Sequence, residues 1–113
     1  MRADQGSAVD ILEHARALIA EPERWTQGAL ARDGDGEELG DAQDPDAACW
    51  CLAGALHHAG YGRATSLLVH RVLSTLDKPV DIVTWNDAPE RSHAQVLLLL
   101  DECIALARAS SLF

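Results

Sequence analysis

The sequence predicts an all-α fold: a compact bundle of four main helices around a central buried helix at about residues 45–59, with a long acidic loop at about residues 33–44. The main observation is the stretch AACWCLAGALHHA, whose first ten residues, 47–56, carry no charged or strongly polar side chain. A helix that is apolar around its whole circumference is a buried helix. Apolar residues also recur at helical spacing on both sides of this stretch. With 113 residues and 48% hydrophobic content, the chain is expected to form a single helical domain over residues 1–113.

The first helix is expected over residues 7–20. Ser7 and Asp10 form a Ser-x-x-Asp capping box at its start, and an apolar stripe with the helical period follows. Pro22 ends this helix soon afterwards. The next segment, residues 25–33, is compatible with a short extended piece or with an ordered turn, and the pattern leaves these two alternatives open.

The acidic loop has some features of a calcium-binding EF-hand loop. Counted from Asp33, acidic residues fall at positions 1, 3, 5, 9 and 12. However, position 6 is Glu38, where the sharp turn of an EF-hand requires glycine, and position 12 is Asp44, which is also needed as a helix cap. A solvated loop without bound calcium is therefore the favoured interpretation.

The central helix has well-marked ends. Asp44 can act as the N-cap, Pro45 occupies the first helical position, and Asp46 places a negative charge in the first turn, where the helix dipole favours it. Gly60 is expected to end the helix in a left-handed conformation.

Two further helices follow in the second half of the chain. One is expected over residues 63–76, ended by Lys78 and Pro79, and the last over residues 93–109. Residues 80–84 are too few for periodicity to distinguish a helical turn from an extended piece. Two capping boxes in series predict a short helical turn that bends into the long last helix: Asp87 with Glu90, and Ser92 with Gln95.

Charge and cysteine content limit which partners and which cellular compartment are expected for this protein. The net charge of −9 is concentrated in residues 33–46, which hold seven acidic residues and no Lys or Arg; the other 11 acidic and nine basic residues leave −2 for the rest. Because no basic stripe exists, nucleic-acid binding is not expected. Three cysteines imply no disulfide framework, and the N-terminus lacks the apolar core of a signal peptide. The longest strictly aliphatic run, residues 96–100, is too short for a membrane span. We therefore expect a cytoplasmic protein without a membrane partner.

Catalysis by a cysteine is the main enzymatic alternative. A reactive thiol needs a helix N-terminus, a cation or a histidine nearby. In the predicted central helix, Cys49 and Cys51 fall at the fifth and seventh helical positions, where the influence of the dipole has mostly faded. A histidine such as His58 could still approach them in the folded chain. The hypothesis of a hydrolase or transferase centre at Cys51 or Cys49 thus stays open, although packing is the more usual role of a free cysteine.

Metal and cofactor binding are not expected. In a helix, Cys49 and Cys51 would point to opposite sides, while Cys51 and His58 would share a face but stand about 10 Å apart. A single zinc ion with bonds of about 2.0–2.3 Å cannot bridge that distance. The sequence therefore predicts no metal site and no cofactor.

The tryptophans mark stronger candidates for a binding site. A tryptophan on a loop beside amide, carboxylate and guanidinium groups offers a stacking face with directed hydrogen bonds, which suits a small polar ligand or a peptide. The alternative is that the tryptophans cover the core and that their polar neighbours only cap helices. The candidate residues are Trp25, Gln27, Trp85, Asn86, Asp87 and Arg91.

Four sequence motifs stand out as a set: Trp-x-Gln-Gly-Ala at residues 25–29, Arg-Asp at 32–33 with Gly36, Trp-Cys-x-x-Gly-Ala-Leu at 50–56, and Trp-Asn-Asp-x-Pro-x-Arg at 85–91. Together they resemble a family of small bacterial and phage proteins of unknown function, over about residues 9–107. The resemblance implies a shared fold and a bacterial or phage origin, but no reaction. It points to small polar residues at the position of His93, which argues against a Cys–His centre. The positions matching a shared site are Gln27, Trp50, Cys51, Trp85, Asn86, Asp87 and Arg91.

Two functional hypotheses follow. In the first, the chain is a non-catalytic binding or interaction module that binds a small polar ligand or a protein partner through residues 85–91 and the loop after Trp25. In the second, it is a cysteine-dependent hydrolase or transferase. A homo-oligomer is a further alternative, for which the apolar tail residues Leu112 and Phe113 are interface candidates.

Overall fold

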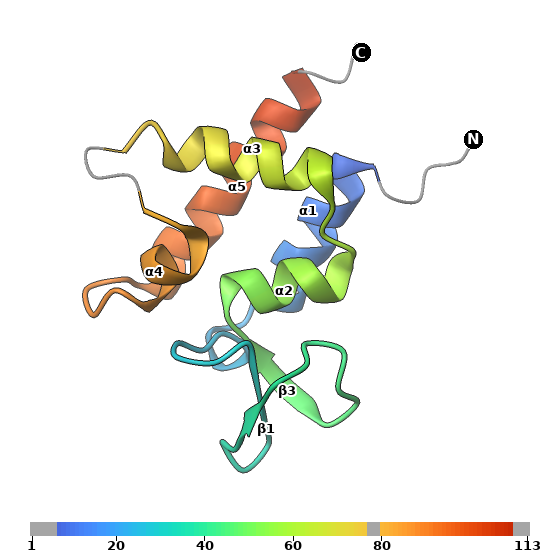
Figure 1. Ribbon diagram of the computed structural model, residues 1–113, viewed down its shortest axis with the longest axis vertical. Coiled ribbons are helices and arrows are strands. Elements are labelled where there is room, and N and C mark those ends of the chain that lie inside the picture. Colours follow the sequence, from blue (N-terminus) through green and yellow to red (C-terminus); the bar gives the residue numbers. More distant parts are fainter. Residues whose placement is uncertain (1–6, 77–79, 110–113) are drawn as a thin grey trace.

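A computed structural model describes residues 7–76 and 80–109 of the protein. Within these residues the chain forms five α-helices, a short 3₁₀ helix and a three-stranded antiparallel sheet of order β2-β1-β3 (Figure 1). The sheet lies at one end of the long axis of the molecule (Figure 1). The elements in chain order are α1 (Ala8–Leu18), η1 (Pro22–Arg24), β1 (Ala31–Asp33), β2 (Glu38–Leu39), β3 (Ala47–Trp50), α2 (Leu52–Ala59), α3 (Arg63–Leu73), α4 (Ile82–Asp87) and α5 (His93–Ala109).

The all-α prediction is wrong, because the first part of the expected central helix is a strand. Residues 47–50 form β3, which pairs antiparallel with β1, and the helix begins only at Leu52. An uncharged segment of this length satisfies burial equally well as a strand or as part of a helix, so apolar character alone could not distinguish them. The second half of the expected central helix is confirmed. Residues 52–56 are all buried, and Gly60 ends α2 in a left-handed conformation with φ of 106°.

The expected helix cap at Asp44 is a turn that leads into β3. The Asp44 carboxylate accepts a hydrogen bond from the Asp46 N–H at 2.9 Å, and the Asp44 carbonyl accepts one from the Ala47 N–H at 3.0 Å. Aspartate before proline supports such a local turn as readily as it caps a helix. The N-cap of α2 is instead Cys51, whose Sγ accepts a hydrogen bond from the Gly54 N–H at 3.3 Å.

The acidic segment is not a long irregular loop but contains an ordered β-hairpin. One carboxylate oxygen of Asp33 accepts hydrogen bonds from the backbone N–H groups of Asp35 and Glu37, both at 2.9 Å. These bonds close the turn between β1 and β2. The extended alternative for residues 25–33 is confirmed for residues 31–33, which form β1.

The remaining helices follow their predicted signals with shorter bounds. Ser7 caps α1 by accepting a hydrogen bond from the Asp10 N–H at 3.2 Å. α3 ends at Leu73, three residues before the predicted end, and Lys78 and Pro79 lie outside the described residues. The reciprocal capping box at the start of α5 is confirmed, with bonds of 2.9 and 3.2 Å between Ser92 and Gln95.

The expected capping box of Asp87 with Glu90 does not form. Asp87 is the last residue of α4, whose N-cap is Asp81. The carboxylate of Asp87 accepts hydrogen bonds from Gly28 and Asn86 rather than from the residues that follow it. The end of α4 is therefore joined to residues 25–28, as described below.

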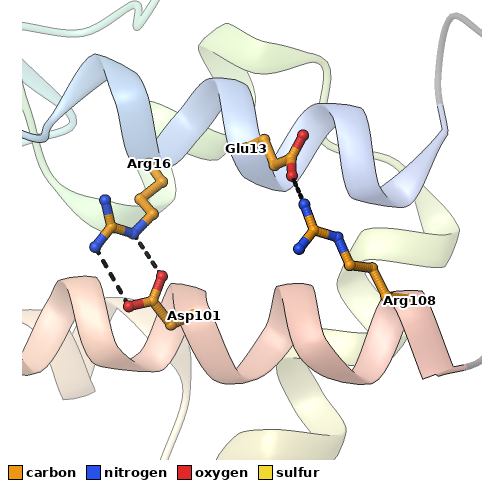
Figure 2. A network of polar contacts seen from close by, with 4 residues as sticks. All are labelled: Glu13, Arg16, Asp101 and Arg108. Atoms are coloured by element: carbon orange, nitrogen blue, oxygen red, sulfur yellow. Dashed lines mark hydrogen bonds and ion pairs between the residues drawn. The ribbon is translucent and has the colours of Figure 1, made fainter.

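Helices α1 and α5 lie side by side and are joined at their surface by two ion pairs (Figure 2). The guanidinium of Arg16 donates two hydrogen bonds to Asp101, at 2.6 and 3.3 Å, and Arg108 pairs with Glu13. Because these side chains are 36–63% exposed, each pair contributes at most about 1 kcal/mol. Beneath them, α1, α2, α3 and α5 bury a common apolar core that includes Leu12, Leu56, Val69 and Leu100. Within residues 7–76 and 80–109, no helix combines the length and apolar character needed to cross a bilayer.

The sheet meets α2 through a backbone contact that requires glycine. The Cys51 N–H donates a hydrogen bond to the Leu30 carbonyl at 3.2 Å. One turn later, a Cβ atom on Gly54 would lie 2.0 Å from the same carbonyl oxygen. The start of α2 therefore packs directly against the backbone of Leu30, the residue before β1.

The variant Gly54→Ala tests this contact. Alanine in a helix normally stabilises by about 1 kcal/mol relative to glycine. Here the steric clash outweighs that gain, and we expect a net loss of about 3 kcal/mol in the free energy of unfolding by urea. Gly34→Ala is the control, because a Cβ at Gly34 meets nothing within 4 Å. Equal unfolding midpoints for the two variants would contradict the close approach.

Candidate functional site

The buried amide of Asn86 is the centre of the candidate site. Asn86 is 0% exposed and lies in α4. Its Oδ1 accepts hydrogen bonds from Trp25 Nε1 at 2.7 Å and from the Leu52 N–H at 3.0 Å. Its Nδ2 donates to the Thr26 carbonyl at 3.2 Å and to the Asp87 carboxylate at 2.9 Å. A primary amide has two acceptor and two donor positions, and all four are occupied here.

The side chains of Gln27 and Asp87 join the same two segments through hydrogen bonds with backbone groups. Gln27 Nε2 donates to the carbonyls of Asn86 and Ala88, at 2.8 and 2.9 Å, which are free because they lie at the end of α4. In return, Asp87 Oδ1 accepts a hydrogen bond from the Gly28 N–H at 3.0 Å. We call residues 25–28 together with residues 85–91 the junction.

Arg91 completes the junction by covering Trp85. Its Nε donates to the Trp85 carbonyl at 2.8 Å, and its guanidinium carbon lies 4.0 Å from the centroid of the Trp85 ring. Trp85 itself is 6% exposed. A guanidinium over a tryptophan face gains a cation–π attraction of about 1 kcal/mol at a half-exposed position such as this.

The junction also involves a residue that the sequence analysis did not single out as a site residue. Arg32 of β1 donates to Thr26 Oγ1 at 3.1 Å, to the Gln27 carbonyl at 3.1 Å and to the Gly36 carbonyl at 3.2 Å. Arg32 thus ties the junction to the β1–β2 turn. The sequence signal that could have identified Arg32 was its place in the Arg-Asp motif at residues 32–33, one of the four motifs that carry the family resemblance.

The structure therefore brings all six predicted binding residues into one contiguous network. Trp25 and Gln27 come from the segment before β1, and the other four come from α4 and the turn after it. Most of their polar atoms are used within the chain. Among the described residues, the Oε1 of Gln27 and the second carboxylate oxygen of Asp87 accept no hydrogen bond, and both side chains are partly exposed.

The two buried cysteines, Cys51 and Cys103, lie in environments that raise the pKa of their thiols. Cys51 is 3% exposed, and burial raises its pKa despite the opposing hydrogen bonds from the start of α2; the charge of Asp87 raises it further. Burial, with a smaller contribution from Glu102, raises the pKa of Cys103 to about 12. Cys49 is half-buried in β3, and its Sγ lies 4.0 Å from the Arg32 carbonyl.

The structure does not assemble a Cys–His centre from His58. The Nδ1 of His58 lies 3.0 Å from the Ala42 carbonyl, and its ring contacts are with Trp50 at 5.3 Å and His14 at 6.0 Å. His93 lies 6.0 Å from the Trp25 ring, with its Nε2 2.7 Å from the Ile19 carbonyl. Both histidines therefore hold structural elements together. In the described parts of the chain, no group of three His, Cys, Asp or Glu side chains could hold a metal ion.

A shallow, open hollow of about 240 Å³ lies elsewhere on the surface. None of the six candidate residues lines it. Its lining residues are Leu30, Gly40, Asp41, Ala42, Gln43 and His57.

Fold and site together define a small domain of helices and an antiparallel sheet in which Asn86 of α4 joins the loop before β1 to the start of α2. The chain belongs to DUF6197, a family of unknown function whose model matches residues 4–106. A comparison with curated proteins and a comparison with solved structures each found no match. The family match confirms the resemblance to an uncharacterised family, while the bacterial or phage origin stays a prediction.

The variant Asn86→Asp tests whether the junction holds the fold. It keeps the shape of the side chain but replaces both amide donors, which face the Thr26 carbonyl and the Asp87 carboxylate, by acceptors. We expect a loss of about 3 kcal/mol in the free energy of unfolding at neutral pH, because a buried carboxylate then faces another acceptor. Asp87→Asn is the matched control, since an amide oxygen can still accept from Gly28; it should cost less than about 1 kcal/mol. Similar losses in the two variants would contradict the central place of Asn86.

Thiol reactivity tests the catalytic alternative. In the folded protein near neutral pH, iodoacetamide should label Cys49 first, while Cys51 and Cys103 react more slowly than a free thiol because they are buried and protonated. Mass spectrometry of the labelled peptides measures this order. Labelling of Cys51 faster than a free thiol would instead support the cysteine-dependent enzyme.

Alkaline unfolding gives a second measurement on Cys103. Its raised pKa means that the folded state keeps a proton that the unfolded chain loses, so this stabilisation is complete below about pH 9 and is lost as pH rises toward 12. The free energy of unfolding should therefore fall more steeply over this range than it does in Cys103→Ala. Parallel curves for the two proteins would contradict the assignment.

Proposed function

We propose that this protein is a non-catalytic binding module whose binding surface is the outer side of the junction. The observation that supports this most is that two segments, about 60 residues apart in sequence, are held in one arrangement. Gln27 and Asn86 donate hydrogen bonds between them, and Asp87 accepts one from the Gly28 N–H. A surface that is ordered before binding avoids the entropy cost of ordering it in the complex.

The chemistry of the junction favours a ligand that donates hydrogen bonds. The Oε1 of Gln27 and the second oxygen of Asp87 are acceptors that no described residue uses, and the partly exposed Trp25 ring lies in the same network. Amide or amine groups of a small polar ligand, or of a protein segment, match such acceptors beside an aromatic surface. The three free cysteines are also consistent with our proposal that the protein acts in the reducing cytoplasm.

The cysteine-dependent enzyme is the second candidate, and the observations count against it. Cys51 lies at a helix N-terminus, which favours a thiolate, but its burial raises the pKa. Among the described residues, the contacts of His58 and His93 are with other groups.

Fragment screening by NMR tests the proposed binding surface. The probes are primary amides and alkylamines, and the reporters are the indole N–H of Trp25 and the side-chain amide of Gln27. We expect shifts at these two groups, and about tenfold weaker binding to Asp87→Asn, which replaces the acceptor oxygen by a donor. Glu23→Gln is the matched control, because it removes the same charge from an exposed residue outside the junction and should leave binding unchanged. Shifts confined to the hollow beside Gln43 and His57, or none at all, would contradict the proposal.

A further inference from the structure

Helix α3 carries an outward stripe of two arginines and a leucine. Arg63, Leu67 and Arg71 follow one another at intervals of four residues, so they align along one side of the helix. All three are exposed, and Leu67 is 64% exposed, the largest value among the exposed large hydrophobic residues described. We call these three residues the α3 stripe.

The arginines of the α3 stripe differ from the other arginines described. The guanidinium groups of Arg63 and Arg71 form no hydrogen bond or ion pair with any described residue. In contrast, the side chains of Arg16 and Arg108 are ion-paired, those of Arg32 and Arg91 donate hydrogen bonds, and that of Arg24 lies over Trp50. α3 also contains no acidic residue that could neutralise the stripe.

The complementary charge lies in the acidic hairpin. Residues 33–46 hold seven acidic residues and no basic one. At the tip, Asp35, Glu37 and Glu38 are exposed, while Asp33 holds the turn in place through its own carboxylate. Figure 1 shows α3 toward one end of the long axis and the sheet with this hairpin at the other, so the two charged surfaces do not meet within one chain.

We propose that the α3 stripe binds the acidic hairpin of a second copy of this chain, in an antiparallel two-fold dimer. In a two-fold arrangement each copy presents its α3 stripe to the hairpin of the other, so both contacts form at once and the assembly closes. The molecule, which measures 44 × 36 × 20 Å, carries its opposite charges at its two ends, as such a dimer requires. This dimer does not depend on the junction, and Leu112 and Phe113 lie outside the described residues.

Each copy carries a net charge of −9, so the stability of the dimer depends on how far salt screens the repulsion between the two copies. At physiological ionic strength the Debye length is about 8 Å, so distant like charges are screened while charges in contact still attract. The dimer should therefore form at moderate salt and weaken when the ion pairs are themselves screened. Analytical ultracentrifugation of the full chain should show a dissociation constant at least about tenfold larger near 0.5 M than near 0.15 M NaCl. A monomer at all concentrations up to about 1 mM, or association insensitive to salt, would overturn the proposal.

A charge-exchange experiment identifies the surfaces. The double variant Arg63→Glu/Arg71→Glu places acid opposite acid, and the double variant Asp35→Lys/Glu37→Lys places base opposite base, so each alone should be monomeric. In their mixture, one contact pairs the glutamates of the first variant's α3 helix with the lysines of the second variant's hairpin. The other contact pairs the unchanged α3 stripe of the second variant with the unchanged hairpin of the first. We therefore expect the equimolar mixture to recover the dimer, with circular dichroism showing that each variant is folded.

The outcomes of this mixture separate the alternatives. If the mixture stays monomeric although both variants are folded, the two surfaces do not contact each other and the proposal is wrong. If the single variants still dimerise, another surface mediates association. Binding of the wild type to phosphatidylserine vesicles, without a dimer in solution, would assign the α3 stripe to an anionic membrane instead and overturn the proposal.

Discussion

The fully satisfied amide of Asn86 is the constraint on which the arrangement of this molecule depends. It contacts an indole, a backbone carbonyl, a carboxylate and the first N–H of α2, from three separate parts of the chain. A buried amide that loses one partner keeps the full cost of its desolvation. The four bonds therefore favour this arrangement strongly over any that would break one of them. The position of α4, the start of α2 and the entry into the sheet are thereby determined together. Asn86 is also the only asparagine of the chain, and no other side chain type combines two donors and two acceptors at that length.

Helices α1, α3 and α5 could be predicted from sequence because their signals are local. The capping residues Ser7 and Ser92 hydrogen-bond as their spacing indicated, and α5 spans the predicted residues 93–109. The strands could not be predicted, because each is at most four residues long and depends on a partner elsewhere. Residues 44–46 show the ambiguity directly: Asp-Pro-Asp is suited both to a helix start and to a turn, and only the pairing of β3 with β1 decides between them.

The members of the candidate site could be predicted, but their partners could not. Tryptophan, glutamine, asparagine and aspartate in two short motifs indicated a polar cluster, and the structure brings the two motifs together. However, Gln27 and Arg32 bind mainly to backbone carbonyls, which every residue carries and which no sequence pattern distinguishes. For the same reason Arg32 was not among the predicted site residues, although its guanidinium joins the junction to the β1–β2 turn.

Two opposing effects act on the pKa of Cys51, because this residue lies at the start of α2 and is also buried. As the N-cap it receives the Gly54 N–H, and a helix N-terminus lowers the pKa of a thiol. At 3% exposure, however, ionisation would place a charge in an apolar site beside the Asp87 carboxylate, and the net effect is a raised pKa. The neutral sulfur is therefore best understood as a cap that also packs, in the position where serine or aspartate is more usual. Cys51 lies directly before Leu52, whose N–H donates to Asn86, so the cap of α2 and its contact with the junction come from adjacent residues. A thiolate there would repel the Asp87 carboxylate, which belongs to the junction.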